Sequence, residues 1–458
     1  MADNNSIPRS SWRQTGPNTW TQPWGFQEVL YNAISVPPGS SGLFILGSAI
    51  IFTPPSSFDT PDHLSALFRH AWLQVLHRYP IVAAESHKDG KRYTPPSSPA
   101  DLEGWLKTTF IVSPAKSWTE IWHSLVKTRK ATLYHLPCSN QLFLQAEHSI
   151  VDGRGVMHLW DTFFHALIAP MPQSTITAPS PIPPTLPPRS DDLLPIPSPN
   201  NGTEQALQLL APLSSITSPV SIPRDTPLPV PSPHNGVTVL KLSKPMTTAI
   251  KTACKSHNIT VTSAWHAAVA LATETIQSRH GIKGTHFATF GNFDLRRYFP
   301  PSKNHDYTVG NHHCVLPHVL NVSDGRTLVD MAKELIQFYG QDLDQPRIWS
   351  ALGPMVEMLV PEFTKEPLEE TTPAVSSLGV VDGFIKREYG GWTVDDAWFG
   401  NTVTGPWLEC FSWAWRGRLC LNVCWNRGFY TEEEVRAFNS EVLEELVGGL
   451  GVGWEAKL

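Results

Sequence analysis

Apolar residues near the N-terminal end of the chain recur at helical spacing. Between residues 64 and 76 they fall three and four positions apart, which predicts one buried face of a helix. Asp62 precedes this run and is predicted to be the N-cap, whereas Tyr79-Pro80 ends the helix because proline cannot continue it. Residues 81–85 are then predicted to enter a strand.

A second strand is predicted at residues 141–148 (QLFLQAEH), which have the apolar, β-prone character of a buried strand. After Asp152-Gly153 the helical spacing returns and continues to residue 167. The segment EHSIVDGRG therefore joins a strand to a helix, and His148 lies at this junction, four residues before Asp152. Rigid elements on both sides would fix the histidine, and the glycine lets a ligand approach the backbone closely.

The second half of the chain shows the same alternation. The hairpin near its end is predicted to turn at Arg416-Gly417, and Thr431 and Glu434 form the capping box of the closing helix. Both halves alternate helices and strands, so the predicted class is α/β or α+β with mixed sheets. The pattern predicts strands at 236–242, 286–300 and 373–385, helices at 246–258, 262–281 and 326–340, and the hairpin at 408–426.

A proline-rich segment separates the two halves. Residues 170–235 contain eighteen of the chain's 42 prolines, and proline both fixes φ and lacks the amide donor of a helix or inner strand. We therefore predict an extended linker there, interrupted by an apolar stretch at 204–213 that docks on a lobe. Since 458 residues exceed one ordinary core, the predicted domains are an N-terminal lobe at 1–169, the linker, and a C-terminal lobe at 236–458.

Composition and charge exclude several classes of function. The chain has a net charge of −6 and no long cluster of Lys or Arg, so nucleic acid and anionic membranes are not expected partners. No apolar run approaches the roughly 18 residues of a membrane helix, and the polar N-terminus lacks a secretory signal, which predicts a cytoplasmic protein. The six cysteines are predicted to be reduced core residues, since Cys420 and Cys424 have the wrong spacing for zinc. No metal site is expected, and His312-His313 are interpreted as loop or lobe-interface residues.

Several segments of the chain together resemble one protein superfamily. They are LHRYPIVAAE, EHSIVDGRG, GNFDLRRYFP followed by VGNHHCVL, VSSLGVVDGF, DDAWFG and SWAWRGRLCLNVCWN. They resemble the HxxxD acyltransferases, which include plant BAHD acyltransferases, chloramphenicol acetyltransferase and peptide-synthetase condensation domains, and they are most similar to the fungal trichothecene O-acetyltransferase-like branch. The resemblance implies a two-lobed chloramphenicol-acetyltransferase-like fold, with a mixed sheet and packed helices in each lobe and the active site between the lobes. It also implies a monomer.

The residues of the HxxxDG segment suit general-base catalysis. A neutral imidazole with a pKa of about 6.5 can take a proton from a hydroxyl or an amine at pH 7. The resemblance gives His148 this role and makes Asp152 a structural residue that points away from the substrate and pairs with an arginine of the second lobe. Arg296 is the first choice for that arginine and Arg297 the second, since Asp294 stands where many plant members have an arginine.

Other candidates border the predicted site. Gly153 is expected to be structural next to the base. The superfamily's Asp-Phe-Gly-Trp-Gly motif is represented here only by DAWFG, in which Asp396 is expected to be structural and near the donor channel. Ser376 and Ser377 fall on the strand that borders the site in relatives, and a hydroxyl there could donate to the oxyanion or line the donor channel.

The function implied by the resemblance is transfer of an acyl group, with acetyl from acetyl-CoA favoured, to a hydroxyl of a hydrophobic specialised metabolite of a fungus. An amine acceptor stays open. Acyl-CoA would be a co-substrate rather than a bound cofactor, and direct attack of the small-molecule acceptor on the thioester needs no covalent intermediate. Three alternatives stay open: a cyclisation or rearrangement that uses His148 as a base without a thioester, acyl transfer from a carrier protein, and a non-catalytic binding protein on the same scaffold.

Overall fold

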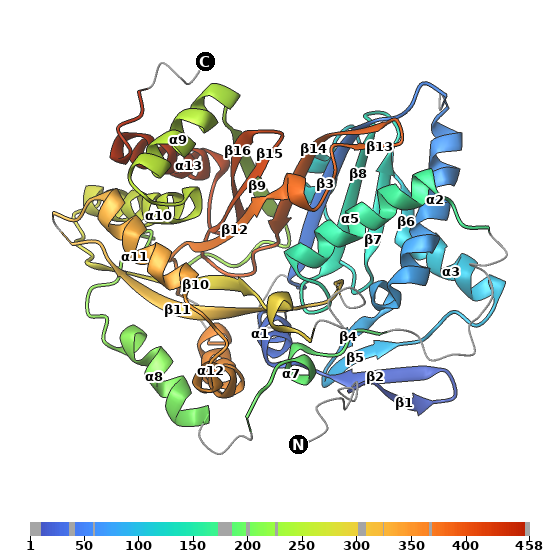
Figure 1. Ribbon diagram of the computed structural model, residues 1–458, viewed down its shortest axis with the longest axis horizontal. Coiled ribbons are helices and arrows are strands. Elements are labelled where there is room, and N and C mark those ends of the chain that lie inside the picture. The colour runs from blue at the N-terminus through green and yellow to red at the C-terminus, as the bar shows by residue number, and fades with distance from the viewer. Residues whose placement is uncertain are drawn as a thin grey trace.

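The computed structural model describes most of the chain as two lobes that lie side by side (Figure 1). Each lobe is organised around its own sheet, with helices packed on it. The mixed α/β class predicted from the sequence is confirmed. The described residues are 11–35, 42–57, 60–172, 186–197, 202–224, 228–300, 308–323, 325–365 and 369–453.

The N-terminal lobe is built around a six-stranded mixed sheet. Its strand order is β13 (Glu388–Tyr389), β14 (Trp392–Asn401), β3 (Ile45–Thr53), β8 (Gln141–Glu147), β7 (Thr132–Leu136) and β6 (Phe110–Val112). Helices α2 (Pro61–Arg78) and α5 (Gly153–Ile168) pack against each other over this sheet (Figure 1). The lobe also contains η1 (Pro80–Ala83), α3 (Pro99–Thr109), α4 (Trp118–His123) and a small sheet of β1 (Arg13–Gly16), β2 (Thr19–Pro23), β5 (Gly90–Tyr93) and β4 (Glu85–His87).

The C-terminal lobe has a four-stranded sheet in the order β12 (Ala374–Val380), β15 (Glu409–Trp415), β16 (Arg418–Asn426) and β9 (Asn235–Lys241). Four helices pack around it: α9 (Lys244–Ser256), α10 (Val261–Arg279), α11 (Leu328–Gly340) and α13 (Glu432–Gly449). The strands β10 (His286–Asp294) and β11 (His313–Asn321) form an antiparallel ribbon that runs from this lobe towards the other (Figure 1). Helices α1 (Phe26–Ser35) and α12 (Pro346–Phe363) pack against each other beside the ribbon. The short helical turns η2 (Arg296–Tyr298) and η3 (Val381–Gly383) follow β10 and β12.

Strand β14 comes from the second half of the sequence but lies in the N-terminal sheet. It pairs antiparallel with β3, so that Trp398 lies opposite Ala49. The side chains of Val394, Trp398 and Phe399 are buried there. Residues of the predicted C-terminal lobe thus complete the sheet of the other lobe, and the boundaries at 169 and 236 follow the order of the chain rather than the sheets. As limits of folding units they stay a prediction.

The predicted hairpin and its closing helix are confirmed. Arg416 and Gly417 both have positive φ, 49° and 75°, which is the backbone that a two-residue hairpin turn requires. The side chain of Thr431 accepts a hydrogen bond from the backbone of Glu434, whose carboxylate bonds back to Thr431, so α13 begins with a capping box.

Two predictions about element ends were wrong. The N-cap of α2 is Thr60, whose hydroxyl accepts from the His63 amide at 3.4 Å, rather than Asp62. Pro61 takes the first helical position, where its missing amide costs nothing, and this moves the cap two residues earlier than the pattern indicated. The turn η1 (Pro80–Ala83) takes up most of the predicted strand entry, and the strand β4 begins only at Glu85.

The apolar stretch that was predicted to interrupt the proline-rich segment 170–235 is a helix. It lies in α8 (Gly202–Ser214), which packs on α12 and so confirms that the stretch docks (Figure 1). The first ten residues of α8 contain no proline, and Ala206 is fully buried, so nothing opposes a helix until Pro212 near its end. A short turn, α7 (Ser190–Leu193), also lies in the segment. Residues 173–185, 198–201 and 225–227 of the segment lie outside the described residues.

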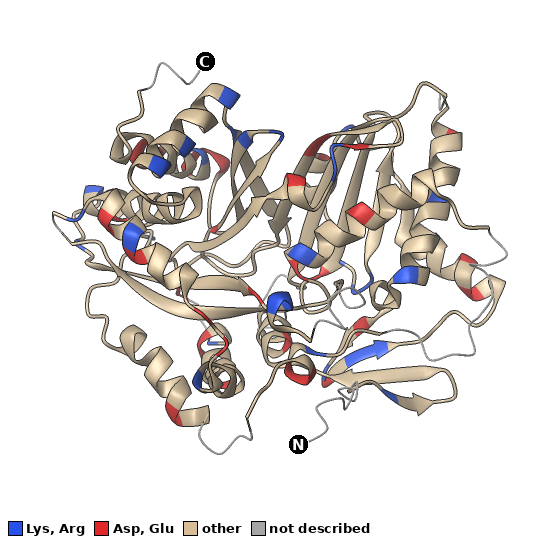
Figure 2. Cartoon of the chain, in the orientation of Figure 1, with Lys and Arg blue, Asp and Glu red and all other residues tan. Residues whose placement is uncertain are grey.

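The structure also shows where the charged side chains and the cysteines lie. Acidic and basic residues are mixed over both lobes (Figure 2). Among the described helices none is long and apolar enough to cross a membrane. Cys138 is exposed because it lies in the turn between β7 and β8, so the prediction of a core position is wrong for this cysteine. The other five cysteines are buried, as predicted.

Candidate active site

His148 lies immediately after β8, in the turn that leads to α5. Its backbone amide donates to the Phe44 carbonyl at 3.0 Å, and its carbonyl accepts from the Asn311 side chain at 2.9 Å. The side chain is 6% exposed and lies against the ring of Tyr31, with ring centroids 4.1 Å apart. The turn is thus held by one bond from its own lobe and one from the second half of the chain.

Burial makes the His148 imidazole a neutral base. Burial and the neighbouring His313 lower its pKa to about 3, against smaller opposing effects of nearby carbonyls and of Asp152. Its Nδ1 atom has no hydrogen-bond partner among the described residues. The imidazole is therefore unprotonated at any physiological pH and is free to accept a proton when a substrate offers one.

Asp152 caps α5 and faces away from the solvent. Its carboxylate accepts from the Gly155 amide and from the His312 amide, both at 2.7 Å, and forms a two-pronged pair with Arg296 at 3.0 and 2.9 Å. Burial alone would raise its pKa, but Arg296 and His313 hold it well below the usual range. Asp152 is thus a fully bonded anion in the wall of the site, which is the structural position that was expected for it.

Arg296 is the arginine of this pair. It lies on η2 directly after β10, and its guanidinium also donates to Asp294 at 3.0 Å and to the Thr308 carbonyl at 2.8 Å. The second choice, Arg297, is exposed and bonds to the hydroxyl of Tyr298 instead. The N–H groups of Arg296 that point into the protein therefore all have acceptors, so the charged guanidinium is buried together with its hydrogen-bond partners.

The end of the β10–β11 ribbon explains why so many contacts converge on this loop. The register of the ribbon places Asp294 opposite His313, so the residues after β10 and those before β11 lie side by side. The Gly310 carbonyl accepts from the Asp152 amide at 3.1 Å, while Asn311 and His312 make the bonds described above. The segment 310–313, GNHH, thus clamps the HxxxDG loop from across the lobes. No group of metal-ligating residues occurs in the described part of the chain.

The other predicted site residues are spread along the seam between the lobes. A Cβ atom on Gly153 would lie 3.2 Å from a methyl of Leu378, so this glycine lets β12 approach the first turn of α5. Ser377 on β12 shares a hydrogen bond of 2.9 Å with Thr262. Asp396 on β14 pairs with Lys241, and it lies roughly 15 Å along the strand from the end that neighbours the His148 turn.

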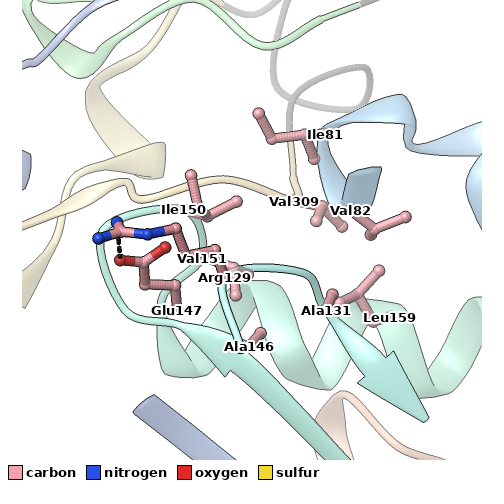
Figure 3. A pocket seen from close by; sticks show the side chains of 10 residues that line it. All are labelled: Ile81, Val82, Arg129, Ala131, Ala146, Glu147, Ile150, Val151, Leu159 and Val309. Atoms are coloured by element: carbon pink, nitrogen blue, oxygen red, sulfur yellow. Dashed lines mark ion pairs between the residues drawn. The ribbon is translucent and has the colours of Figure 1, made fainter. Parts of the chain in front are cut away.

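A small cavity lies behind the His148 turn, on the side of η1 (Figure 3). It has a volume of about 10 Å³ and an almost wholly apolar wall. Glu147 lies at its edge, accepts from the Ser86 hydroxyl at 2.6 Å and pairs with Arg129 at 3.5 Å (Figure 3). A space of this size admits at most one water and no substrate, so it is a gap in the packing behind the loop rather than a binding site.

Sequence reasoning missed two polar residues of the site. Tyr31 reaches His148 from α1, and Glu409, the first residue of β15, is close enough to raise the pKa of Tyr31. The Glu409 residue is half-buried, and its carboxyl group is surrounded by protein. Burial raises its pKa to about 7, and a bond of 3.4 Å from Trp407 only partly opposes the shift. Neither residue belongs to a recognisable motif, so no local signal could have found them.

The raised pKa of Glu409 has a measurable consequence for stability. Between the unfolded pKa of about 4.3 and the folded value of about 7 the native state binds more protons than the unfolded state, so stability falls as pH rises through this window. Glu409→Gln removes the effect. We expect its melting temperature to match that of the wild type at pH 5 and to exceed it at pH 8, with the exposed Glu433→Gln as a control. Identical differences at both pH values would contradict the assignment.

The chain is similar in sequence and in fold to fungal acetyltransferases. No family model matches the chain. It is 25% identical over 443 residues to O-acetyltransferase pigM of Monascus ruber, covering 92% of this chain and 83% of that protein. It is 23% identical over 462 residues to acetyltransferase pigO of the same organism, covering 96% and 98%. The structure of TRI3 trichothecene 15-O-acetyltransferase from Fusarium sporotrichioides superposes with a TM-score of 0.78 at 17% identity, over 97% of this chain and 99% of that one.

These matches bear out three sequence-based predictions. The chain is related over nearly its whole length to fungal acetyltransferases, as the motifs indicated. Its fold is the two-lobed one of the trichothecene acetyltransferase. The comparisons also support the prediction that the protein is an acyltransferase.

Proposed function

We propose that this chain transfers an acetyl group from free acetyl-CoA to a hydroxyl of a hydrophobic small molecule of specialised metabolism, with His148 as general base. The observation that carries the proposal is a neutral, buried imidazole on a turn that both lobes hold in place. The acetyltransferase names of the relatives from Monascus ruber favour acetyl as the group transferred. No bound cofactor enters the proposal, and the protein acts as a monomer in the cytoplasm.

The proposed reaction is a direct transfer. His148 takes the proton of the acceptor hydroxyl as the oxygen attacks the thioester carbonyl, so that a C–O bond forms and the carbonyl becomes a tetrahedral oxyanion. The C–S bond then breaks, and the imidazolium gives its proton to the departing thiolate. General-base help of this kind contributes about 10²–10⁴-fold to the rate. Holding both substrates between the lobes supplies the rest through proximity and orientation.

The charges around the base suit this proton transfer. The imidazolium that forms in the transition state carries a positive charge into a buried site, where the Asp152 carboxylate raises the pKa of His148 and so favours its protonated form. The oxyanion needs a donor, for which Ser377 and Ser376 on β12 are the candidates within the proposal. Arg296 keeps Asp152 ionised and fixed throughout.

Binding of the donor tests the proposal without knowledge of the acceptor. A ligand at about a hundred times its Kd adds about 2.7 kcal/mol to the stability of the protein, which shifts the melting temperature by a few degrees. We expect a clear shift with acetyl-CoA, a smaller one with long-chain acyl-CoA, and an undiminished shift in His148→Ala. If no CoA thioester changes the melting temperature, free CoA is not the donor, and a carrier-bound acyl group or a thioester-free cyclisation takes its place.

A further inference from the structure

The rings around His148 form a cluster drawn from three separate parts of the chain. The Tyr31 ring, on α1, lies with its centroid 4.1 Å from that of His148 and its plane tilted by 30°. The Phe44 ring is 5.4 Å away and nearly parallel to the imidazole. Because Nδ1 of His148 has no hydrogen-bond partner among the described residues, we take the contacts with these two rings as the main restraint on the plane of the imidazole.

The hydroxyl of Tyr31 is tied to the clamp segment. It lies 2.5 Å from Nε2 of His313, and Nδ1 of the same imidazole lies 3.7 Å from the Asp152 carboxylate. Burial, Glu409 and Asp152 all raise the pKa of Tyr31 well above its ordinary value, so the phenol keeps its proton and donates a hydrogen bond to Nε2 of His313. The Nδ1–H of His313 then faces Asp152. The rings of Tyr31 and His313 both lie against the imidazole of His148, with centroids 4.1 and 5.6 Å from it.

We propose that Tyr31 is a positioning residue for the base: its ring face fixes the plane of the His148 imidazole, and the contact of its hydroxyl with His313 fixes the ring of Tyr31. The inference deepens the proposed function, on which it rests. It assigns to His313 a task in the site, whereas the sequence had indicated only a loop or interface role for the His312-His313 pair.

The same arrangement acts on charge as well as on orientation. An imidazolium against the face of an aromatic ring is stabilised by the ring's electrons, and a hydrogen bond from the phenol to His313 increases the electron density of that ring. The position of Tyr31 is itself secured, because Asp191 of α7 accepts from the Phe26 amide at the start of α1 at 3.2 Å. Ring, hydroxyl and helix are therefore fixed before any substrate arrives, as a preorganised site requires.

Two variants of Tyr31 separate the ring from its hydroxyl. Tyr31→Leu removes both, and Tyr31→Phe keeps the ring. We measure release of free thiol from acetyl-CoA with water as the acceptor. Misplacing a catalytic group costs about 10²-fold, so kcat should fall by about this factor in Tyr31→Leu and by less than about tenfold in Tyr31→Phe, with KM for acetyl-CoA unchanged. An unchanged kcat in Tyr31→Leu, or equal losses in both variants, overturns the proposal.

Tyr389→Leu is the matched control. This tyrosine is also buried, stacks on Phe164 at 5.0 Å and donates to Asp161 at 2.7 Å, but it lies on β13 away from the HxxxDG loop. Its replacement should lower the melting temperature and leave kcat unchanged. If kcat falls as far in Tyr389→Leu as in Tyr31→Leu, the loss reflects general destabilisation, and the positioning role is overturned.

A second readout keeps this inference separate from the proposed function. If the wild-type protein releases no thiol, water does not replace the acceptor, and the donor is judged by the shift in melting temperature alone. The reaction of His148 with diethyl pyrocarbonate, followed by mass spectrometry of its peptide, then decides the positioning role. We expect Tyr31→Phe to react at the wild-type rate and Tyr31→Leu at a rate that differs several-fold. Without the Tyr31 ring against it, the imidazole takes a different orientation and is reached differently by the reagent. Equal rates in all three proteins overturn the proposal.

Discussion

Replacing His148 with alanine is expected to lower kcat for acyl transfer by about 10²–10⁴-fold and to leave the fold intact. The imidazole is the proton acceptor of the proposed reaction. Its Nδ1 atom has no hydrogen-bond partner among the described residues, so the substitution leaves no side-chain partner of that atom unpaired. Thiol release from acetyl-CoA measures the rate, and circular dichroism with a melting curve checks the fold.

A second buried histidine provides the control for this substitution. His266 lies in α10 of the other lobe, and burial likewise lowers its pKa to about 3, but it contacts Tyr339 rather than the HxxxDG loop. His266→Ala should therefore lower stability without the loss of kcat. A His148→Ala protein that turns over acetyl-CoA at the wild-type rate would remove the general base from the mechanism.

The depressed pKa of His148 also sets the pH profile of the wild-type enzyme. A base whose pKa is about 3 in the folded protein is already deprotonated at pH 5.5, so its titration causes no fall in kcat/KM between pH 8 and pH 5.5. An ordinary histidine would produce a fall near its pKa of about 6.5. A limb at that pH which disappears in His148→Ala would show that burial does not depress this pKa.

The HxxxDG junction could be predicted from the sequence because the information is local. The change from strand-like to helical spacing across residues 141–167 falls at the junction that the structure contains, and Asp152 caps the helix there. The same local reasoning misplaced the start of α2, since apolar spacing says nothing about the effect of Pro61 on the cap. Periodicity finds elements better than it finds their ends.

The contacts that cross the seam could not be predicted in this way. Arg296 was named only through a family resemblance, with Arg297 as a rival, and the choice between them depends on how η2 follows the ribbon. Tyr31 is more than a hundred residues from His148 and 282 from His313, and its position depends on the docking of α1. Strand β14 likewise lies in the sheet of the N-terminal lobe, although it comes from the second half of the sequence. Contacts of this kind arise from tertiary packing and produce no periodic pattern in the sequence.

Arg296→Ala is expected to cost about 3–5 kcal/mol in the free energy of unfolding, because it leaves the Asp152 carboxylate buried without its counter-ion. The side chain of Arg296 is nearly enclosed, and the lost guanidinium also served the carbonyl of Thr308. Urea unfolding measures the loss. Arg297→Ala, which removes an exposed arginine one residue away, should change the same quantity by less than about 0.5 kcal/mol.

The pH dependence of this loss identifies its electrostatic origin. In the wild type the folded pKa of Asp152 lies well below its unfolded value, so the ion pair contributes stability above the unfolded pKa and loses it only as pH falls through the folded one. Without Arg296, burial is opposed only by His313 and by the amides of Gly155 and His312, so the pKa of Asp152 rises and protonation of the carboxyl becomes easier as the pH falls. The deficit of Arg296→Ala should therefore be larger at pH 8 than at pH 5, and Asp152→Asn in the same chain should recover part of it. A deficit that is equal at both pH values, with no recovery, would assign the loss to packing, and the Asp152–Arg296 pair would not be the electrostatic strut that joins the lobes.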